Sequence, residues 1–194
     1  MSTKSPKHRG GKNTGAQPRQ GSVIAPDEPL SPDAGLLKVA LRFFGIYAIL
    51  QLATWYVAYL GYFDAVVQVT ARITGACSRL TGVPAIASGY EVFLASRVLR
   101  IDVACTGISL MLIYAALVLA YPLGIERKLI GLLVGLPVLA VVNVLRLTAV
   151  AQLSGRLNDK AFYFVHDFLF EAVMAAAVIV LWGLYLAWAK RHAR

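Results

Sequence analysis

The sequence contains few charged residues and little cysteine, and each shortage excludes a class of protein. Charged residues make up 15% of the chain, whereas soluble globular domains contain about 25%. The two cysteines, Cys77 and Cys105, are too few for the disulfide scaffold of a small secreted protein. The sequence also lacks a CxxC pair and a Cys/His cluster of the zinc-binding type. It therefore indicates neither a metal nor an organic cofactor.

Hydrophobic residues take the place of the missing charge. They make up 58% of the 194 residues, and the mean hydropathy is +0.66. They are concentrated in long blocks, and ~20 mostly apolar residues are enough to cross the hydrocarbon layer of a membrane. The length suffices for one domain. The pattern therefore favours a small integral membrane protein over a soluble protein with a large core.

The basic residues indicate contact with a membrane rather than with nucleic acid. The net charge is +9 and the pI is about 9.8, and a basic balance can be a sign of nucleic-acid binding. Here much of the Lys and Arg lies in the N-terminal tail and beside the apolar blocks, as on the cytoplasmic side of membrane spans. We expect contact with the lipid bilayer and none with nucleic acid.

The chain divides into a tail, a membrane domain and a short basic end. Residues 1–35 are rich in Gly, Ser, Pro, Lys and Arg, and contain too few large apolar residues to offset the entropy of ordering. We expect a disordered basic tail in the cytoplasm there. A transmembrane domain is predicted at residues 36–190 and a basic cytoplasmic end at residues 191–194.

The predicted fold is an all-α, polytopic membrane helical bundle of about four transmembrane helices. The spans cover approximately residues 43–60, 105–123, 129–145 (or as far as 153) and 162–188. Glu126, Arg127 and Lys128 are expected to form a charged turn between the second and third spans. Four spans place both termini on one side of the membrane, and the Lys and Arg residues beside them favour the cytoplasmic side.

Two segments between the first and second spans differ from the rest. Residues 64–82 predict an amphipathic helix lying at the membrane interface. Its apolar stripe consists of Val66, Val67, Thr70, Ile73, Leu80 and the small residues between them. Residues 83–104 contain Pro84, Gly89 and strand-favouring residues in imperfect alternation. They predict a loop or a short extended hairpin on the extracytoplasmic side.

Three reactive side chains fall at a similar depth at the outer face if the spans alternate in direction. Cys105 begins the second span, Arg146 lies in the last turns of the third, and His166 lies early in the fourth. A thiolate is a strong nucleophile, and histidine can transfer a proton near neutral pH. Arginine can stabilise a carboxylate or a tetrahedral oxyanion. Together these types are suited to acyl transfer.

Each of the three residues also has an ordinary structural interpretation. A lone cysteine in an apolar segment is commonly an inert packing residue. Arg146 could anchor the end of a span at the lipid headgroups, and His166 could be an interfacial residue with a satisfied hydrogen bond. Charged residues within spans tend to mark functional sites, and the convergence of all three side chains favours function.

Three motifs in this order resemble those of the exosortase/archaeosortase family. They are Val-Ala-Cys-Thr-Gly-Ile at residues 103–108, Asn-Val-Leu-Arg at residues 143–146, and Phe-Tyr-Phe-Val-His at residues 162–166. Upstream, Gly82-Val83-Pro84 and Gly89 are similar to the family's pattern before the cysteine. The resemblance covers residues 40–190 and is to the short exosortase-like subtypes.

The resemblance implies a membrane-embedded cysteine transpeptidase or protease of the inner (plasma) membrane, with its active site at the extracytoplasmic face. Its catalytic set would be Cys105, Arg146 and His166. Its substrates would be exported, membrane-anchored proteins with a C-terminal sorting signal, which comprises a short motif, one transmembrane helix and a basic end. The enzyme would cleave near the motif, form a thioester on Cys105 and transfer the product to an acceptor.

Residues beside the catalytic set are expected to support it. Thr106 and Gly107 belong to the cysteine motif, and Asn143 would orient either Arg146 or the substrate, unless it forms a plain helix–helix hydrogen bond. Asp102 could recognise the substrate or be a solvated loop charge, and its negative charge by itself disfavours a thiolate nearby.

Two further features have paired interpretations. Glu171, inside the fourth span, needs a partner; either it pairs with Arg146 or it packs between helices as a protonated acid. Gly131 and Gly135 are predicted to permit close helix packing, within the chain rather than in a dimer. Gly107 and Gly124 are assigned the same packing role.

Three other classes of function stay open. A non-catalytic membrane assembly factor or scaffold would need no nucleophile and would tolerate loss of Cys105. A small transporter would show polar residues at mid-span along a pathway, where this sequence is largely apolar. A thiol-redox role is disfavoured by the wide spacing of the two cysteines.

Overall fold

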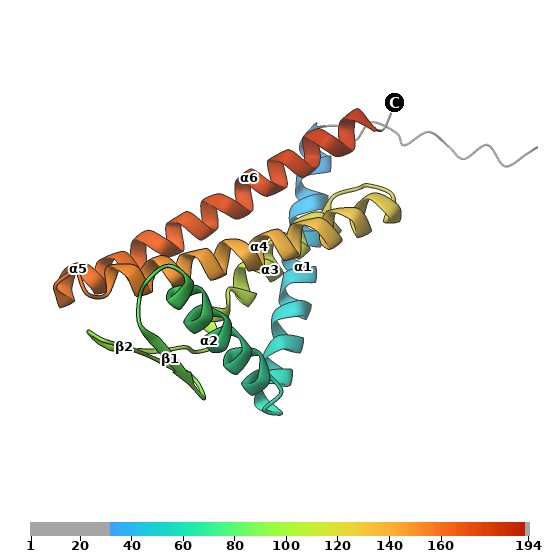
Figure 1. The fold of residues 1–194 in the computed structure, drawn as a ribbon. Helices are drawn as coiled ribbons and strands as arrows, with labels where there is room; N and C mark the ends of the chain where they lie inside the picture. Colours follow the sequence, from blue (N-terminus) through green and yellow to red (C-terminus); the bar gives the residue numbers. More distant parts are fainter. Residues whose placement is uncertain (1–31, 193–194) are drawn as a thin grey trace, which may run out of the picture. The chain divides into compact units, whose positions relative to one another are not determined.

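The computed structural model describes residues 32–192. Residues 1–31 of the predicted tail and residues 193–194 of the predicted basic end lie outside the described residues. In chain order the elements are α1 (Pro32–Tyr59), α2 (Phe63–Leu80), β1 (Ala85–Ser88), β2 (Glu91–Leu94), β3 (Val98–Arg100), the 3₁₀ turn η1 (Ala104–Thr106), α3 (Ile108–Ala120), α4 (Ile125–Leu153), α5 (Asp159–Tyr163), the π-helical segment η2 (Phe164–Leu169) and α6 (Phe170–Arg191) (Figure 1).

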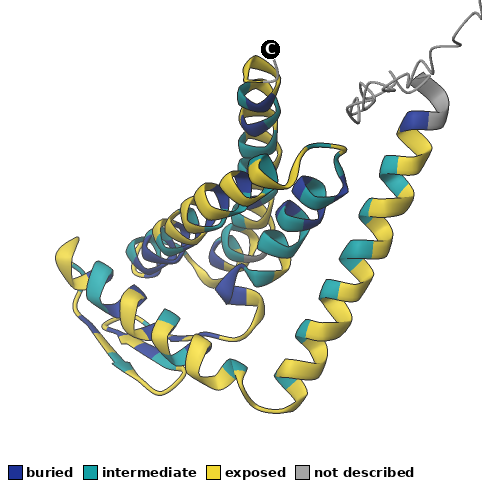
Figure 2. Cartoon of the chain, turned by 90° about the vertical axis from the view of Figure 1, so that its right-hand side faces the viewer, coloured by how far each residue is buried: buried dark blue, intermediate teal, exposed yellow. Residues whose placement is uncertain are grey.

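The prediction of a membrane helical bundle is confirmed. Within the described part of the chain, three helical stretches are long and apolar enough to cross a membrane, at residues 35–59, 125–153 and 159–191. The last of these comprises α5, η2 and α6 in succession, and α6 lies alongside α4 (Figure 1). α1 packs against α3, yet most of its surface is exposed (Figure 2). Its exposed side chains are largely apolar, as a helix facing lipid requires.

The expected second span is shorter than predicted. α3 has 13 residues, which rise only ~20 Å, and Cys105 lies before it in η1 rather than in its first turn. The helix begins late because Gly107 has a φ of +74°. It ends early because Tyr121, the residue before Pro122, is extended, with a ψ of 138°.

The expected charged turn between the second and third spans is wrong in position. Glu126, Arg127 and Lys128 belong to the first turn of α4, which begins at Ile125 and continues without a break to Leu153. An acidic residue in the first turn of a helix interacts favourably with the helix dipole. The true connection is the short segment at residues 121–124.

α2 confirms the predicted amphipathic helix, but it buries mainly the small residues of the predicted stripe rather than the larger apolar ones. Its buried residues are Val67, Ala71, Thr74, Gly75 and Ser78. Val66, Ile73 and Leu80 of the predicted stripe are exposed. The small residues face inward because α2 packs closely against β1 and α4, and at Gly75 the Cβ of Ala87 would lie 3.1 Å from an added methyl.

The segment at residues 83–104 forms a three-stranded antiparallel sheet in the order β1-β2-β3. β1 and β2 form the predicted hairpin, with Ser88 opposite Glu91. Gly89, the first residue of the two-residue turn, has a φ of +58°, which hairpin turns of this length favour. β3 is an addition to the prediction, with Val92 opposite Leu99.

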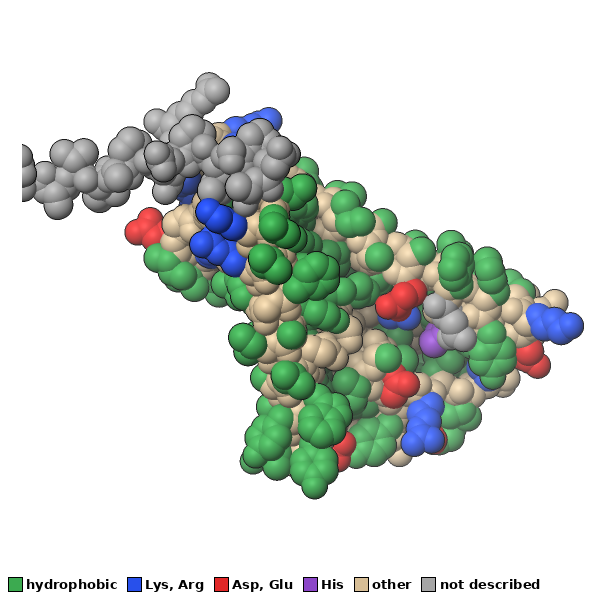
Figure 3. Space-filling view, turned by 180° about the vertical axis from the view of Figure 1, so that it is seen from behind, with side chains coloured by type: hydrophobic (Ala, Val, Ile, Leu, Met, Phe, Trp, Pro, Cys, Tyr) green, Lys and Arg blue, Asp and Glu red, His purple; other side chains and the backbone are tan. Residues whose placement is uncertain are grey.

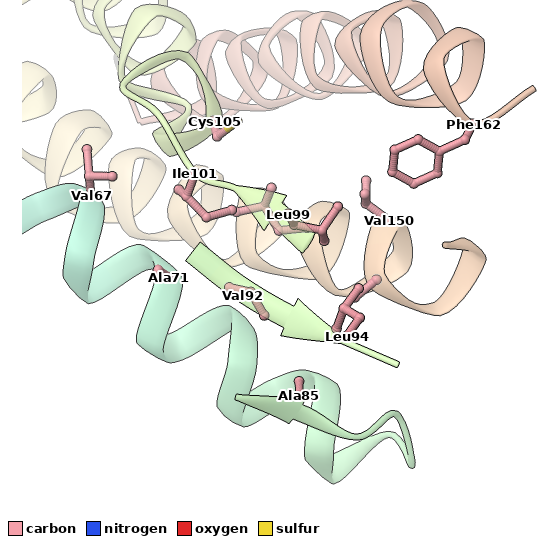
Figure 4. Packing of buried hydrophobic residues seen from close by; sticks show 12 residues of the cluster. Val67, Ala71, Ala85, Val92, Leu94, Leu99, Ile101, Cys105, Val150 and Phe162 are labelled. Carbon is pink, nitrogen blue, oxygen red and sulfur yellow. The ribbon is translucent and has the colours of Figure 1, made fainter. Parts of the chain in front are cut away.

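Two clusters of buried apolar side chains organise the described residues. One lies around the sheet and joins α2, the strands, η1, α4 and α5 (Figure 4). Its members are Val67, Ala71, Ala85, Val92, Leu94, Leu99, Ile101, Cys105, Leu147, Val150, Ala151 and Phe162. The second lies among α3, α4 and α6, and includes Tyr114, Leu139, Val178 and Tyr185.

The second cluster depends on two glycines of α4. The ring of Tyr185 packs against Gly131, and the ring of Tyr114 packs against Gly135, each at a place where a Cβ would collide with the ring. The Tyr114 hydroxyl donates to the Gly131 carbonyl at 3.1 Å. The predicted packing role within the chain is confirmed for this pair, whereas a Cβ at Gly124 would meet no atom within 4 Å.

Replacing Gly135 by Ala is expected to destabilise the domain by about 1–3 kcal/mol, as overpacking of a filled site does. The Tyr114 ring is 1% exposed and has little room to retreat. Thermal unfolding of the protein in detergent measures the effect. Gly183→Ala in α6 is the matched control, because no atom lies within 4 Å of the added methyl. Equal stability of the two variants would contradict the packing of α3 against α4 at this point.

Candidate functional site

Cys105 lies in a short turn that leaves the sheet and leads into α3. The carboxylate of Asp102 accepts a hydrogen bond from the Cys105 N–H at 2.9 Å, and the Thr106 hydroxyl donates to the Val103 carbonyl at 2.5 Å. Cys105 is 7% exposed. Side chains that bond to the backbone a few residues away stabilise turns in place of a regular helix, so this sequence shapes the turn locally.

Asn143 of α4 fastens this turn to the helix bundle. Its Nδ2 donates to the Cys105 carbonyl at 2.9 Å, and the amide is 2% exposed. A Cβ at Gly107 would lie 3.0 Å from the Asn143 Cγ, so only glycine permits this approach together with its positive φ. The hydrogen bond of Asn143 thus joins α4 to the turn η1, and its acceptor belongs to Cys105 itself.

Arg146 lies one turn further along α4 and is 7% exposed. Its Nη2 lies 3.5 Å from Oε2 of Glu171, so the ion pair considered from the sequence is present. The carboxylate side chain of Glu171 is 57% exposed, and such a pair contributes little to stability. Nε and Nη1 of Arg146 are buried and have no hydrogen-bond partner among the described residues. Arg146 therefore does not extend to the headgroups as a simple anchor.

His166 lies in the π-helical segment η2. Its ring stacks on the Phe162 ring, with 5.8 Å between centroids and an interplanar angle of 19°. The Phe162 ring also contacts Arg97, whose guanidinium carbon lies 3.9 Å from the ring centroid. Arg97 is fixed in turn by the Leu157 carbonyl at 3.2 Å and by Asp159 at 3.5 Å.

The turn, α4 and η2 bring the predicted site residues into one charged cluster. The charge of Arg146 acts on the Cys105 thiol, and that of His166 acts on the Asp102 carboxylate. Charged side chains and a histidine gather in a hollow of one face of the molecule, between apolar surfaces (Figure 3). Among the side chains that the structure describes, no group of three His, Cys, Asp or Glu could hold a metal ion.

Burial and neighbouring charges shift two groups of the turn in opposite directions. Burial raises the pKa of Asp102, but hydrogen bonds from Cys105 and Ala104 and the charge of His166 outweigh it, so the pKa is lowered. Burial also raises the pKa of the Cys105 thiol. The Asp102 carboxylate adds to that rise, and a hydrogen bond with the Asp102 backbone and the charge of Arg146 only partly oppose it. The thiol is therefore mostly protonated at neutral pH, and Asp102 is more than a solvated loop charge.

The three motifs lie within the residues that one comparison with known proteins matches. The transmembrane exosortase family model matches residues 34–192. The chain belongs to the transmembrane exosortase family. No curated protein and no solved structure matches the chain.

Sequence reasoning on this exosortase missed one pair of residues. Arg97 received no role, and Phe162 was noted only as an aromatic neighbour of His166. The sequence did contain a signal for Phe162: it lies four residues before His166, and residues four apart on a helix lie on one face. Nothing in the sequence could place Arg97 above Phe162, since that contact joins the β2–β3 turn to α5.

In a Cys77→Ser background, the rate at which iodoacetamide alkylates Cys105 is expected to rise with pH, because the thiolate is the form that reacts. The midpoint of this rise should lie at a higher pH than for an ordinary cysteine, because the pKa of Cys105 is raised. Asp102→Asn should lower this midpoint, since Asn keeps an acceptor for the Cys105 N–H but removes the negative charge. Arg146→Gln should raise it. Mass spectrometry of the labelled protein across neutral and alkaline pH measures all three, and identical midpoints would contradict this electrostatic account.

Proposed function

We propose that this exosortase is a membrane-embedded cysteine transpeptidase or protease. It cleaves the C-terminal sorting signal of exported, membrane-anchored proteins and transfers them to an acceptor through a thioester on Cys105. The observation that supports this best is the buried Arg146 guanidinium, whose Nε and Nη1 have no hydrogen-bond acceptor among the described residues and whose charge acts on the thiol. Buried donors are normally bonded, so a substrate oxygen is a fitting partner.

The proposed reaction uses the three side chains in sequence. The thiol loses its proton to His166, and the thiolate adds to the scissile carbonyl carbon. Arg146 stabilises the oxyanion that forms. The C–N bond then breaks, its electron pair leaves with the nitrogen, and that nitrogen takes the proton from His166. An acceptor nucleophile, or water, then gives its proton to His166 and attacks the thioester carbonyl carbon. The C–S bond breaks, and the sulfur leaves as a thiolate that takes the proton back from His166.

The raised pKa of Cys105 sets the requirement for the first step. A thiol that stays protonated at neutral pH needs a base at the moment of attack, in contrast to a preformed thiolate. Arg146 already opposes the rise, and a substrate that excludes water would strengthen the interaction of thiolate with guanidinium. Asn143 and Asp102 act in this scheme as positioning residues, because both bond to the backbone of Cys105.

The proposed orientation places the site at the extracytoplasmic face of the inner membrane. Arg127 of α4 donates to the His192 carbonyl at 3.3 Å, and Lys128 donates to the Leu119 carbonyl at 2.7 Å. The start of α4 and the ends of α3 and α6 thus meet in a basic region, which favours the cytoplasm. The site lies toward the opposite end of α4, and both termini of the chain would be cytoplasmic.

Processing of a co-expressed reporter tests the nucleophile. The reporter is a secreted domain that ends in a C-terminal sorting segment from the same genome, and its shortened form is followed by immunoblot. Cys105→Ala is expected to abolish processing at wild-type membrane levels, because no thioester can form. Cys77→Ala is the matched control, since it removes the other free thiol. Full processing by Cys105→Ala would leave the alternative, a non-catalytic assembly factor or scaffold.

Arg146→Lys separates charge from geometry in the same assay. Lysine keeps a positive charge near Glu171 but loses the planar fork of donors. We expect a fall in processing of about 10²–10³-fold, the range for loss of one oxyanion donor. Glu171→Gln should cost much less, because its carboxylate is largely exposed. Wild-type rates in Arg146→Lys would contradict a role for the fork.

A further inference from the structure

β3 is an edge strand of the sheet; no further strand of the described chain pairs with its outer side, and this edge lines a cavity beside the site. We propose that this edge, the outward main-chain groups of Val98 and Arg100, binds an extended, carboxylate-bearing segment of the substrate polypeptide as a fourth strand. The inference rests on the proposed function and specifies how the substrate is bound.

The hydrogen-bond pattern shows which groups face outward. In an antiparallel pair, residues alternate between those bonded to the partner strand and those directed away from it. Leu94 donates to the Arg97 carbonyl at 2.9 Å, and Ile101 donates to the Tyr90 carbonyl at 2.8 Å. Residues 97, 99 and 101 therefore face β2. The N–H and C=O groups of Val98 and Arg100 face the opposite edge.

The two edges of the sheet are treated differently by the fold. α2 packs along β1, and Arg79 of α2 donates to the Ala85 carbonyl at 2.9 Å. Exposed edges invite pairing with another chain, and proteins commonly cover or shorten them. The edge of β3 instead borders a cavity of about 480 Å³, which Val98, Leu99 and Arg100 line on one side.

The cavity connects this edge with the catalytic side chains. Its other wall is formed by Asp159, Phe162, Tyr163 and His166. β3 ends at Arg100, and Cys105 follows in the turn after it. A strand paired with β3 would therefore lie along His166 and approach the turn that contains the thiol, as a cleavage site must.

The charges that line the cavity specify the occupant further. Arg97 is paired with Asp159, but Arg100 forms no ion pair with any side chain that the structure describes, including Glu91 opposite it on β2. The Nε of Arg97 is buried and lacks a hydrogen-bond partner among the described residues. The uncompensated positive charge fits a carboxylate, and β-strand addition supplies the main-chain hydrogen bonds that peptide recognition of this kind uses.

Proline at position 98 tests the main-chain pairing. Val98→Pro removes the outward N–H, and proline is tolerated at such edge positions. The comparator is Val98→Ala, which shortens the side chain and keeps the N–H. We expect reporter processing to fall about tenfold further in Val98→Pro than in Val98→Ala, as for one unmet hydrogen bond. Alkylation of Cys105 by iodoacetamide should be the same in both, which shows that the turn is intact.

Disulfide trapping gives a second measurement that does not require proline. Val98→Cys is placed in a Cys77→Ser, Cys105→Ala chain, and single cysteines are moved through the reporter segment that precedes its transmembrane helix. A bound strand predicts trapping at alternate reporter positions. Arg100→Glu should reduce trapping, and Arg100→Lys should retain more of it. Trapping with a helical period, or none at all, would overturn the proposal.

The outcomes separate this inference from the proposed function. Full processing by Cys105→Ala would mean that the proposed function has failed. Loss of processing in Cys105→Ala, together with equal processing by Val98→Pro and Val98→Ala and no alternating pattern of trapping, would mean that only the β3 edge has been assigned wrongly.

Discussion

The hydrogen bond from Asn143 to the Cys105 carbonyl is the contact on which the rest of the site depends. It joins the turn after the sheet to the middle of α4, in a place too buried for water to substitute easily. A buried carbonyl without a partner costs about 1–3 kcal/mol. Gly107 makes the approach possible, because a side chain there would meet Asn143. This contact therefore holds the Cys105 turn and the adjoining sheet next to the part of α4 that carries Arg146.

The long helices supply the rigid frame behind that contact. Within lipid there is no hydrophobic force between helices, so their association depends on close packing of small residues. Gly131 and Gly135 provide it by admitting the rings of Tyr185 and Tyr114. The packing aligns α3, α4 and α6 with one another, and this alignment is what allows Arg146 on α4 to reach Glu171 on α6.

Asp102 has two opposing effects on the turn that contains Cys105. Asp102 orders the turn by accepting the Cys105 N–H, but its charge and the burial of the thiol both oppose ionisation. In the proposed mechanism the thiol is therefore protonated at rest, and its reactivity depends on Arg146 and His166. Asp102 thus stabilises the turn but disfavours the thiolate form of Cys105. An isosteric change of Asp102 to Asn separates the two effects, because it keeps the hydrogen-bond acceptor and removes the charge.

Much of this molecule follows from the sequence alone, because membrane insertion makes strong demands on local composition. Apolar length predicted the long helices α1, α4 and α6, although not the short length of α3. The family motifs indicated Cys105, Arg146, His166 and Asn143 as the residues to examine. The Arg146–Glu171 pair was one of two interpretations of Glu171, since an acidic group within a bundle needs a partner.

Only the tertiary structure decided how these residues meet. The late start of α3 depends on the φ of Gly107, and the third strand depends on pairing between residues that periodicity alone did not connect. The stack of Arg97 on Phe162 and the open edge of β3 arise from contacts between distant segments. Local composition can state that a helix crosses a membrane. Which side chains face one another across the bundle depends on packing, and packing involves every element at once.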